Sequence, residues 1–281
     1  MENMFENRQE HATETCLKYY NYGPNISFIP YREVSYRFIY VDDVHKMLYC
    51  AVPKVASTNW KKMFMLLNSH GNESVANIDM DEVHEGNATW PFIKPLKSYS
   101  PVEVAERIQN YTKVMWVRNP LHRLVSAWRS KFTKNNTFYN EVYGSHIIKK
   151  YRPDATEAEI KAGFPVTLKE FFLYLRDEGL VRGDVHWGHF HTHCLSCIIP
   201  YDYIGKLEDM VYEATYVIRK VTGNNKFKFS LDSERDTAPS LSDSDYLQAL
   251  KELPLDLLQY VASEFKIDYE MFGYPLPRFF D

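Results

Sequence analysis

Short apolar runs alternate with amphipathic segments along most of the chain. The runs at 46–52, 113–117 and 203–207 are typical of buried strands, and the alternating segment 36–41 predicts a further strand. Apolar residues at helical spacing follow these runs. They predict helices at 58–68, 100–109, 120–132, 167–178 and 209–221 and two more within 242–266. Strands that alternate with helices predict an α/β fold whose central parallel sheet is flanked by helices.

Residues 1–35 show no clear periodicity, and we expect an irregular N-terminal segment there. We expect the rest of the chain, 36–281, to form a single domain. Residues 69–98 contain Gly and Pro and predict a surface connection.

The 281 residues are 45% hydrophobic and 15% aromatic, which is typical of a globular protein with a sizeable core. The net charge of −4 gives no reason to expect nucleic-acid binding. No run of about 20 apolar residues is present, so the sequence shows no transmembrane helix. The polar, acidic N-terminus does not resemble a signal peptide.

Charge is distributed unevenly along the chain. Segment 44–72 contains Lys, segment 107–134 contains Lys and Arg, and neither segment contains Asp or Glu. A basic strip in an acidic protein indicates a local anion site, whereas the alternative is a solvated helix face.

The first acid-free segment contains a strand, a turn and a helix start. The strand stops at Pro53, Lys54 lies in the turn, and Ser57 and Thr58 open the helix. Backbone N–H groups at a helix start and the helix dipole favour an anion. The Gly-x-x-x-x-Gly-Lys-[Ser/Thr] pattern is absent, which disfavours an ATPase, a GTPase or a nucleoside-phosphate kinase. The alternative is an ordinary helix start with a solvated lysine.

The second acid-free segment has a similar design. Arg118 ends a strand, Ser126 lies two turns into the next helix, and Arg123 is within reach. An arginine fork and a hydroxyl suit a terminal phosphate. Ligands of parallel sheets bind beyond the carboxyl ends of the strands, where both segments fall. The pair therefore predicts a cofactor with phosphates at both ends of a nucleoside.

Cysteine and histidine residues gather near residue 190. His189, His191, His193, Cys194 and Cys197 have the types and spacing of a zinc site, but Cys194 and Cys197 are also candidates for disulfides with each other or with other cysteines. Four cysteines are too few for a disulfide scaffold, and Cys50 is expected to be a buried thiol.

Five N-glycosylation sequons point to a secretory lumen, although random matches are the alternative. Their asparagines are Asn25, Asn72, Asn87, Asn110 and Asn135.

The two phosphate-site segments resemble the signatures of a known family. Cys-x-x-Pro-Lys-Val-Ala-x-Thr-Asn-Trp at 50–60 and Val-Arg-x-Pro-x-x-Arg-Leu-Val-Ser-Ala-Trp-Arg-x-Lys-Phe at 117–132 are similar to those of Golgi carbohydrate sulfotransferases, in particular the chondroitin/dermatan 4-O-sulfotransferase branch. The likeness continues through Asp184-Val-His-Trp187, Cys194-Leu-Ser-Cys197, Tyr201-Asp-Tyr-Ile-Gly-Lys-Leu-Glu208 and Asp268-Tyr-Glu-Met-Phe-Gly-Tyr274.

This resemblance implies a P-loop-like sulfotransferase fold and 3′-phosphoadenosine-5′-phosphosulfate (PAPS) as the donor, with no metal. Residues Lys54–Asn59 would hold the 5′-phosphosulfate, and Arg118 and Ser126 the 3′-phosphate. The cofactor-binding residues are predicted to be Pro53, Lys54, Val55, Ala56, Ser57, Thr58, Asn59, Arg118, Arg123 and Ser126. The chain departs from the family pattern at Asn119, where an acid is frequent, and at Ser57, where a cysteine is common.

Sulfuryl transfer requires a group that stabilises the leaving phosphate and a base that takes the hydroxyl proton. We predict Lys54 for the first role and His186 for the second, because Asp184 two residues away can tune the imidazole. Glu208 is the competing base, and a structural histidine beside Trp187 is the alternative for His186.

The predicted function is transfer of a sulfuryl group to a sugar hydroxyl of a glycosaminoglycan, most specifically the 4-O position of N-acetylgalactosamine in chondroitin. The alternatives are a sulfotransferase for another N- or O-linked glycan and a non-catalytic glycan-binding protein of the same fold. The family implies a membrane-associated protein of the Golgi lumen, although no membrane anchor is visible in the sequence.

Overall fold

The chain divides into two compact units. Unit 1 consists of residues 1–118, 189–237 and 270–274, and unit 2 consists of 119–188, 238–269 and 275–281. The structure, a computed structural model, describes residues 1–24, 34–69, 78–79, 83, 92–180, 183–231 and 243–277. Most of the predicted surface connection at 69–98 lies outside the described residues. The single domain predicted for 36–281 stays a prediction.

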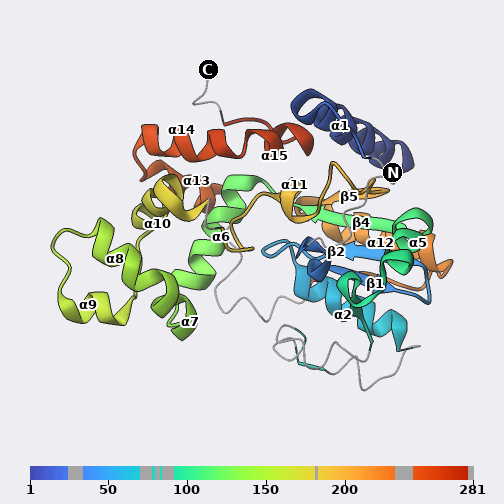
Figure 1. Cartoon of the computed structure of the whole chain (residues 1–281), viewed down its shortest axis with the longest axis horizontal. Helices are drawn as coiled ribbons and strands as arrows, with labels where there is room; N and C mark the ends of the chain where they lie inside the picture. The colour runs from blue at the N-terminus through green and yellow to red at the C-terminus, as the bar shows by residue number, and fades with distance from the viewer. Residues whose placement is uncertain are drawn as a thin grey trace. The chain divides into compact units, whose positions relative to one another are not determined.

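Unit 1 is built on a five-stranded sheet with the order β3-β1-β2-β4-β5 (Figure 1). The strands β2 (Met47–Cys50), β4 (Thr112–Val117) and β5 (Tyr203–Lys206) are adjacent and parallel, which confirms the predicted fold class. Strand β1 (Ile39–Asp42) is antiparallel to both of its neighbours, β2 and the edge strand β3 (Lys94–Pro95). A tight turn after β1 reverses the chain, because the buried Asp42 carboxylate accepts from the backbone N–H groups of Val44 and His45.

Helices flank this sheet where the hydrophobic pattern predicted them. In unit 1 the predicted helices are α2 (Ser57–Asn68), α5 (Pro101–Asn110) and α12 (Met210–Thr222). The short α11 (Phe190–His193) and the 3₁₀ turns η2 (Leu96–Ser98) and η5 (Leu207–Asp209) were not predicted. The 3₁₀ turn η1 (Val34–Phe38) replaces the first half of the strand predicted at 36–41. Helix α2 packs on β2 through the rings of Trp60 and Tyr49, and α12 packs on β5.

The core of unit 1 contains a stack of aromatic rings. The ring of Trp60 lies 5.2 Å from that of Tyr49 and 5.2 Å from that of Trp116, and all three side chains are fully buried. Gly205 on β5 lies opposite Trp116, and a Cβ at position 205 would lie only 1.7 Å from the indole. The glycine is therefore required for close packing, which ties β5 to the two strands that precede the phosphate-site segments.

The N-terminal segment corrects a sequence-based expectation. Residues Glu2–Tyr20 form the helix α1, whereas an irregular segment was expected over 1–35. The buried face of α1 is narrow, and Phe5, Ala12 and Cys16 are among its few apolar residues. The sequence therefore shows little of the apolar spacing that is typical of a helix. The helix is fixed in unit 1 by Arg8, whose guanidinium donates to the carboxylate of Glu213 at 2.8 and 2.9 Å.

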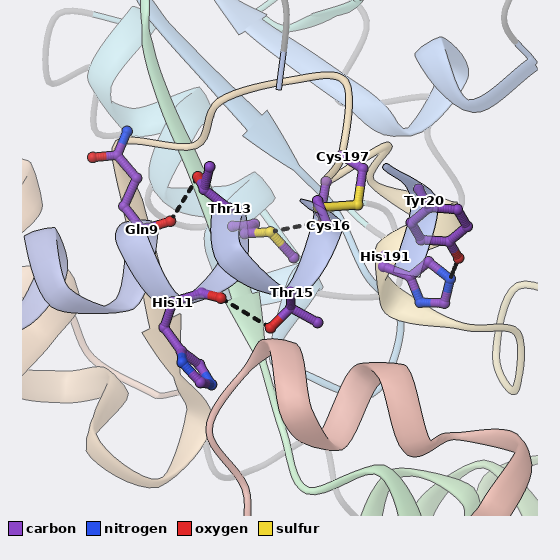
Figure 2. Close-up of a disulfide and its surroundings, with 10 residues drawn as sticks. Gln9, His11, Thr13, Thr15, Cys16, Tyr20, His191 and Cys197 are labelled. Carbon is purple, nitrogen blue, oxygen red and sulfur yellow. Dashed lines mark hydrogen bonds between the residues drawn. A yellow bond between two sulfur atoms is a disulfide. The ribbon is translucent and has the colours of Figure 1, made fainter. Parts of the chain in front are cut away.

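All four cysteines form disulfides, Cys16–Cys197 and Cys50–Cys194. The prediction of a buried thiol at Cys50 was therefore wrong, and Cys194 and Cys197 each pair with a distant cysteine. Figure 2 shows how the first disulfide joins α1 to the segment that follows α11. Neither sulfur of the Cys-x-x-Cys pair is left as a thiolate, so the structure excludes the zinc site that would use them.

The Cys16–Cys197 disulfide closes a loop of 181 residues, so its removal should destabilise the protein. We expect the variant Cys16→Ser with Cys197→Ser to lose about 2–5 kcal/mol of unfolding free energy, because the cross-link restricts the unfolded chain. Urea unfolding followed by circular dichroism measures the loss. Glu14→Gln, an exposed change on the same helix, is the matched control. Equal midpoints for the disulfide variant and the control would contradict this expectation.

The described part of unit 2 contains helices and no strand. The helices are α6 (Pro120–Phe132), α7 (Thr137–Tyr139), the π-helix η3 (Asn140–Gly144), α8 (Ser145–Tyr151), α9 (Glu157–Ala162), α10 (Leu168–Tyr174), the π-helix η4 (Leu175–Gly179), α13 (Asp243–Lys251) and α14 (Leu255–Glu264). A last helix, α15 (Lys266–Met271), begins in unit 2 and ends in unit 1. The predicted Thr167–Glu170 capping box opens α10.

Candidate functional site

The loop between β2 and α2 has an unusual backbone. Lys54 and Ala56 have φ values of 70° and 55°, in the left-handed region that residues with side chains rarely occupy. Each such residue costs about 1–2 kcal/mol and persists only where its surroundings impose it. Positive φ values on either side of Val55, which has none, give the loop without glycine the alternating backbone handedness that is typical of anion-binding turns.

The first turn of α2 is suited to negative charge. Its N-cap, Ala56, offers no side-chain acceptor to the N–H groups, and the turn contains no acidic residue. Ser57, Thr58 and Asn59 are half-buried there and add polar side chains. A helix of 12 residues with such an N-terminus attracts an anion through its N–H groups and its dipole.

The structure brings Arg118 to this loop. Strands β2 and β4 are parallel neighbours, with Cys50 paired with Met115, so their carboxyl ends lie side by side. Nη1 of Arg118 donates to the carbonyl oxygen of Lys54 at 3.4 Å. Residues 64 positions apart in sequence thus place a guanidinium, a lysine and a helix N-terminus together in unit 1.

The base of the loop is held on more than one side. The disulfide Cys50–Cys194 fixes the end of β2 to the segment after α11. The imidazole Nε2 of His193 lies 3.3 Å from the carbonyl oxygen of Ala51, and the N–H of Ala51 donates to the carbonyl of Phe38 at 2.8 Å. These contacts explain how the strained loop keeps its conformation.

The two other histidines of this segment also contact protein groups. The rings of His189 and His191 lie 5.5 Å apart, and Nε2 of His191 is 2.8 Å from the hydroxyl of Tyr20 on α1 (Figure 2). His191 thus helps to join α1 to the α11 segment.

Helix α6 carries the remaining residues of the second signature and belongs to unit 2. Its N-cap is Asn119, whose side-chain oxygen accepts from the N–H of His122 at 3.3 Å, so the departure from the family pattern keeps the cap. Ser126 is half-buried on this helix.

Arg123 lies at the base of the loop that carries His186. Its side chain is fully buried, and its guanidinium donates to the carbonyl oxygens of Gly188 at 2.5 Å and Val185 at 2.8 Å. These carbonyls flank His186. This guanidinium therefore supports the loop that carries His186, and its predicted contact with the cofactor stays a prediction.

His186, Asp184 and Tyr139 form a hydrogen-bonded cluster in unit 2. Nδ1 of His186 lies 2.5 Å from the Asp184 carboxylate and 2.9 Å from the Tyr139 hydroxyl. Tyr139 also donates to the carboxylate at 3.3 Å, and the backbone N–H of His186 donates to it at 2.9 Å. An Nδ1–H that donates to Asp184 leaves Nε2 as the proton acceptor of the ring. Sequence reasoning missed Tyr139, because no local pattern links it to a residue 47 positions away.

Charge at this cluster follows from its burial. Burial alone would raise the pKa of Asp184, but the hydrogen bond and charge of His186 outweigh it and lower the pKa below its ordinary value. Burial lowers the pKa of the Lys131 ammonium, which lies 4.5 Å from the centre of the Tyr139 ring. Burial and the Asp184 charge raise the pKa of Tyr139, so its hydroxyl stays a hydrogen-bond donor.

The competing base, Glu208, is in a different environment. Its side chain is exposed in unit 1, and its carboxylate accepts a hydrogen bond from the Tyr274 hydroxyl at 2.8 Å. A carboxylate open to water is a weaker candidate for a base than an imidazole held by a buried carboxylate.

Comparison with known proteins identifies the family of the chain. Residues 37–275 match the model of the sulfotransferase family. The chain belongs to this family, and its α/β sheet flanked by helices is the sulfotransferase fold. No solved structure matches the chain.

Several relatives are carbohydrate sulfotransferases. Carbohydrate sulfotransferase 9 of Homo sapiens is 36% identical over 97% of this chain and 60% of its own length. Carbohydrate sulfotransferase 8 of Mus musculus is 34% identical over 97% of this chain and 64% of its own length. Carbohydrate sulfotransferase 11 of Rattus norvegicus is 33% identical over 97% of this chain and 76% of its own length. The chain thus spans less than two thirds of the length of the first two. Among the described residues, no helix is both long and apolar enough to cross a membrane.

Proposed function

We propose that the chain is a PAPS-dependent carbohydrate O-sulfotransferase. The observation that carries the proposal is the meeting of Arg118 with the strained Lys54 loop at the N-terminus of α2. Two cationic side chains and uncapped N–H groups, without an acid in the first helical turn, fit a doubly phosphorylated donor. The family membership of the chain supports the same donor.

In this proposal Lys54–Asn59 bind the 5′-phosphosulfate, and Arg118 and Ser126 bind the 3′-phosphate. The sulfur–oxygen bond to the phosphate breaks as a sugar hydroxyl forms a new bond to sulfur. Lys54 stabilises the negative charge that develops on the leaving phosphate. Nε2 of His186 takes the hydroxyl proton, while Asp184 holds the imidazole in the required tautomer and stabilises the imidazolium. None of these steps requires a metal.

The acceptor is a glycan, as the names of the relatives suggest. The motif resemblance favours the 4-O position of N-acetylgalactosamine in chondroitin. Sulfation of another N- or O-linked glycan is the second candidate, since carbohydrate sulfotransferases 8, 9 and 11 are similar to this chain to nearly the same degree.

We further propose that the protein acts in the Golgi lumen. Two disulfides and no free cysteine fit an oxidising compartment. The sequons are consistent with the same lumen.

Binding of adenosine 3′,5′-bisphosphate tests the proposal. We expect this ligand to raise the melting temperature of the full chain, because binding to the folded state alone stabilises it. A radiolabelled sulfate transfer assay across chondroitin, dermatan, heparan and glycoprotein acceptors then identifies the acceptor. A folded sample that shows no thermal shift at millimolar ligand would refute the donor assignment. Binding without transfer to any glycan would favour the non-catalytic alternative.

Replacement of Arg123 by lysine separates support of the loop from cofactor binding. A lysine keeps the charge but cannot donate in a fork to the carbonyls of Val185 and Gly188. We expect kcat to fall about 10- to 100-fold, because small displacements of a catalytic group are costly, while bisphosphate affinity is unchanged. Steady-state kinetics and calorimetry measure the two quantities, with exposed Lys149→Ala as control. A loss confined to bisphosphate affinity would instead support Arg123 as a cofactor ligand.

A further inference from the structure

Two of the five sequons lie in the described part of the chain, at Asn110 and Asn135. Asn110 is the last residue of α5, and Thr112, which completes its sequon, is the first residue of β4. The Asn110 side chain is exposed, and its amide nitrogen donates at 2.9 Å to the carbonyl of Glu106 in its own helix. The asparagine is thus presented at the surface of unit 1.

A groove of about 450 Å³ lies directly beside this asparagine, which is one of its lining residues. Helix α1 contributes Glu2, Glu6 and Gln9 to the lining, and the start of β5 contributes Asp202 and Tyr203. The lining combines carboxylates and amides with aromatic rings. Such groups hydrogen-bond sugar hydroxyls and pack on the apolar faces of sugar rings.

We propose that Asn110 carries an N-linked glycan whose first sugars lie along this groove. In the modification, the side-chain nitrogen bonds to C1 of the first sugar, the bond from C1 to a lipid diphosphate breaks, and the amide loses one proton. The lipid diphosphate oligosaccharide is the co-reactant. The inference rests on the luminal location given under Proposed function, but not on the sulfotransferase activity.

The groove and the Lys54–Asn59 segment, which we call the donor loop, lie at opposite ends of β4. The strand begins at Thr112, next to Asn110, and ends at Val117, immediately before Arg118. Six residues in a strand span about 20 Å. A glycan on Asn110 therefore leaves the donor loop accessible, and its loss should not change the affinity for adenosine 3′,5′-bisphosphate.

Glycopeptide analysis tests the modification. The full chain is expressed behind a cleavable signal sequence in mammalian cells, so that it enters the lumen whatever its natural route. We expect mass spectrometry to find a glycan at Asn110, and Asn110→Gln and Thr112→Ala each to remove one glycan, whereas Thr112→Ser retains it. Secreted protein with an unmodified Asn110 would overturn the inference.

A double-variant cycle tests whether the first sugars of the glycan lie in the groove. Melting temperatures are compared for the wild type, Gln9→Ala, Asn110→Gln and the double variant. We expect the glycan to raise the melting temperature, and Gln9→Ala to reduce that gain, because contacting groups do not act additively. If the two substitutions change the melting temperature additively, the first sugars of the glycan do not lie in the groove. Binding of adenosine 3′,5′-bisphosphate is measured on the same samples. A lack of binding would count against the proposed function, whereas it would leave the inference about the glycan untouched.

Discussion

Alanine at position 118 is expected to abolish measurable sulfate transfer and to weaken adenosine 3′,5′-bisphosphate binding by about 100-fold. The guanidinium of Arg118 would lose its charge-assisted hydrogen bonds to the 3′-phosphate, worth roughly 1.5–3 kcal/mol each. It would also lose the bond to the carbonyl of Lys54, which helps to hold the strained loop. Arg118→Lys should recover only part of the binding, because an ammonium lacks the planar fork.

Isothermal titration calorimetry with the bisphosphate measures this effect, and the transfer assay measures turnover. Lys97→Ala removes an exposed cation from the same unit and should leave both quantities unchanged. Lys54→Ala should abolish transfer as well, with a larger effect on kcat than on bisphosphate affinity, because its main role is in the transition state. If Arg118→Ala and Lys54→Ala both retain activity, the assignment of the donor loop is wrong.

Replacing His186 by alanine is expected to lower kcat by about 10²- to 10⁴-fold with little change in bisphosphate affinity, because the reaction would lose its general base. In the wild type, kcat/KM should rise with pH over the range in which an imidazole loses its proton. This rise should disappear in His186→Ala. The pKa of Asp184 is lowered, so its carboxylate stays ionised throughout that range and does not shape the profile.

Two further substitutions show whether the cluster acts as a unit. Asp184→Asn removes the acceptor that fixes the Nδ1–H tautomer of His186, so we expect kcat to fall almost as far as in His186→Ala. Tyr139→Phe removes a hydrogen bond but leaves the carboxylate, so a smaller loss is expected. A large loss of kcat in Glu208→Gln, combined with nearly full activity in His186→Ala, would transfer the role of base to Glu208.

Much of the fold could be predicted from local patterns. Buried strands such as 113–117 are short apolar runs, and the helix 120–132 has a proline in its first turn and a regular apolar face, so both were placed to within a residue. The helix α1 was missed because its buried face is narrow and its stabilising partners, Glu213 and Cys197, are distant in sequence. Local periodicity carries no information about such partners.

The sequence by itself determined the residue types of the donor loop and their place at the ends of two buried strands. It did so because apolar runs and helix starts are local signals. Only the tertiary structure decided that the Arg118 guanidinium reaches the Lys54 carbonyl, that Lys54 and Ala56 adopt positive φ values, and how the cysteines pair. It also showed that the Arg123 guanidinium donates to the carbonyls of Val185 and Gly188, on either side of His186. These features depend on contacts between segments that are distant in sequence. Such segments come together only when the chain folds.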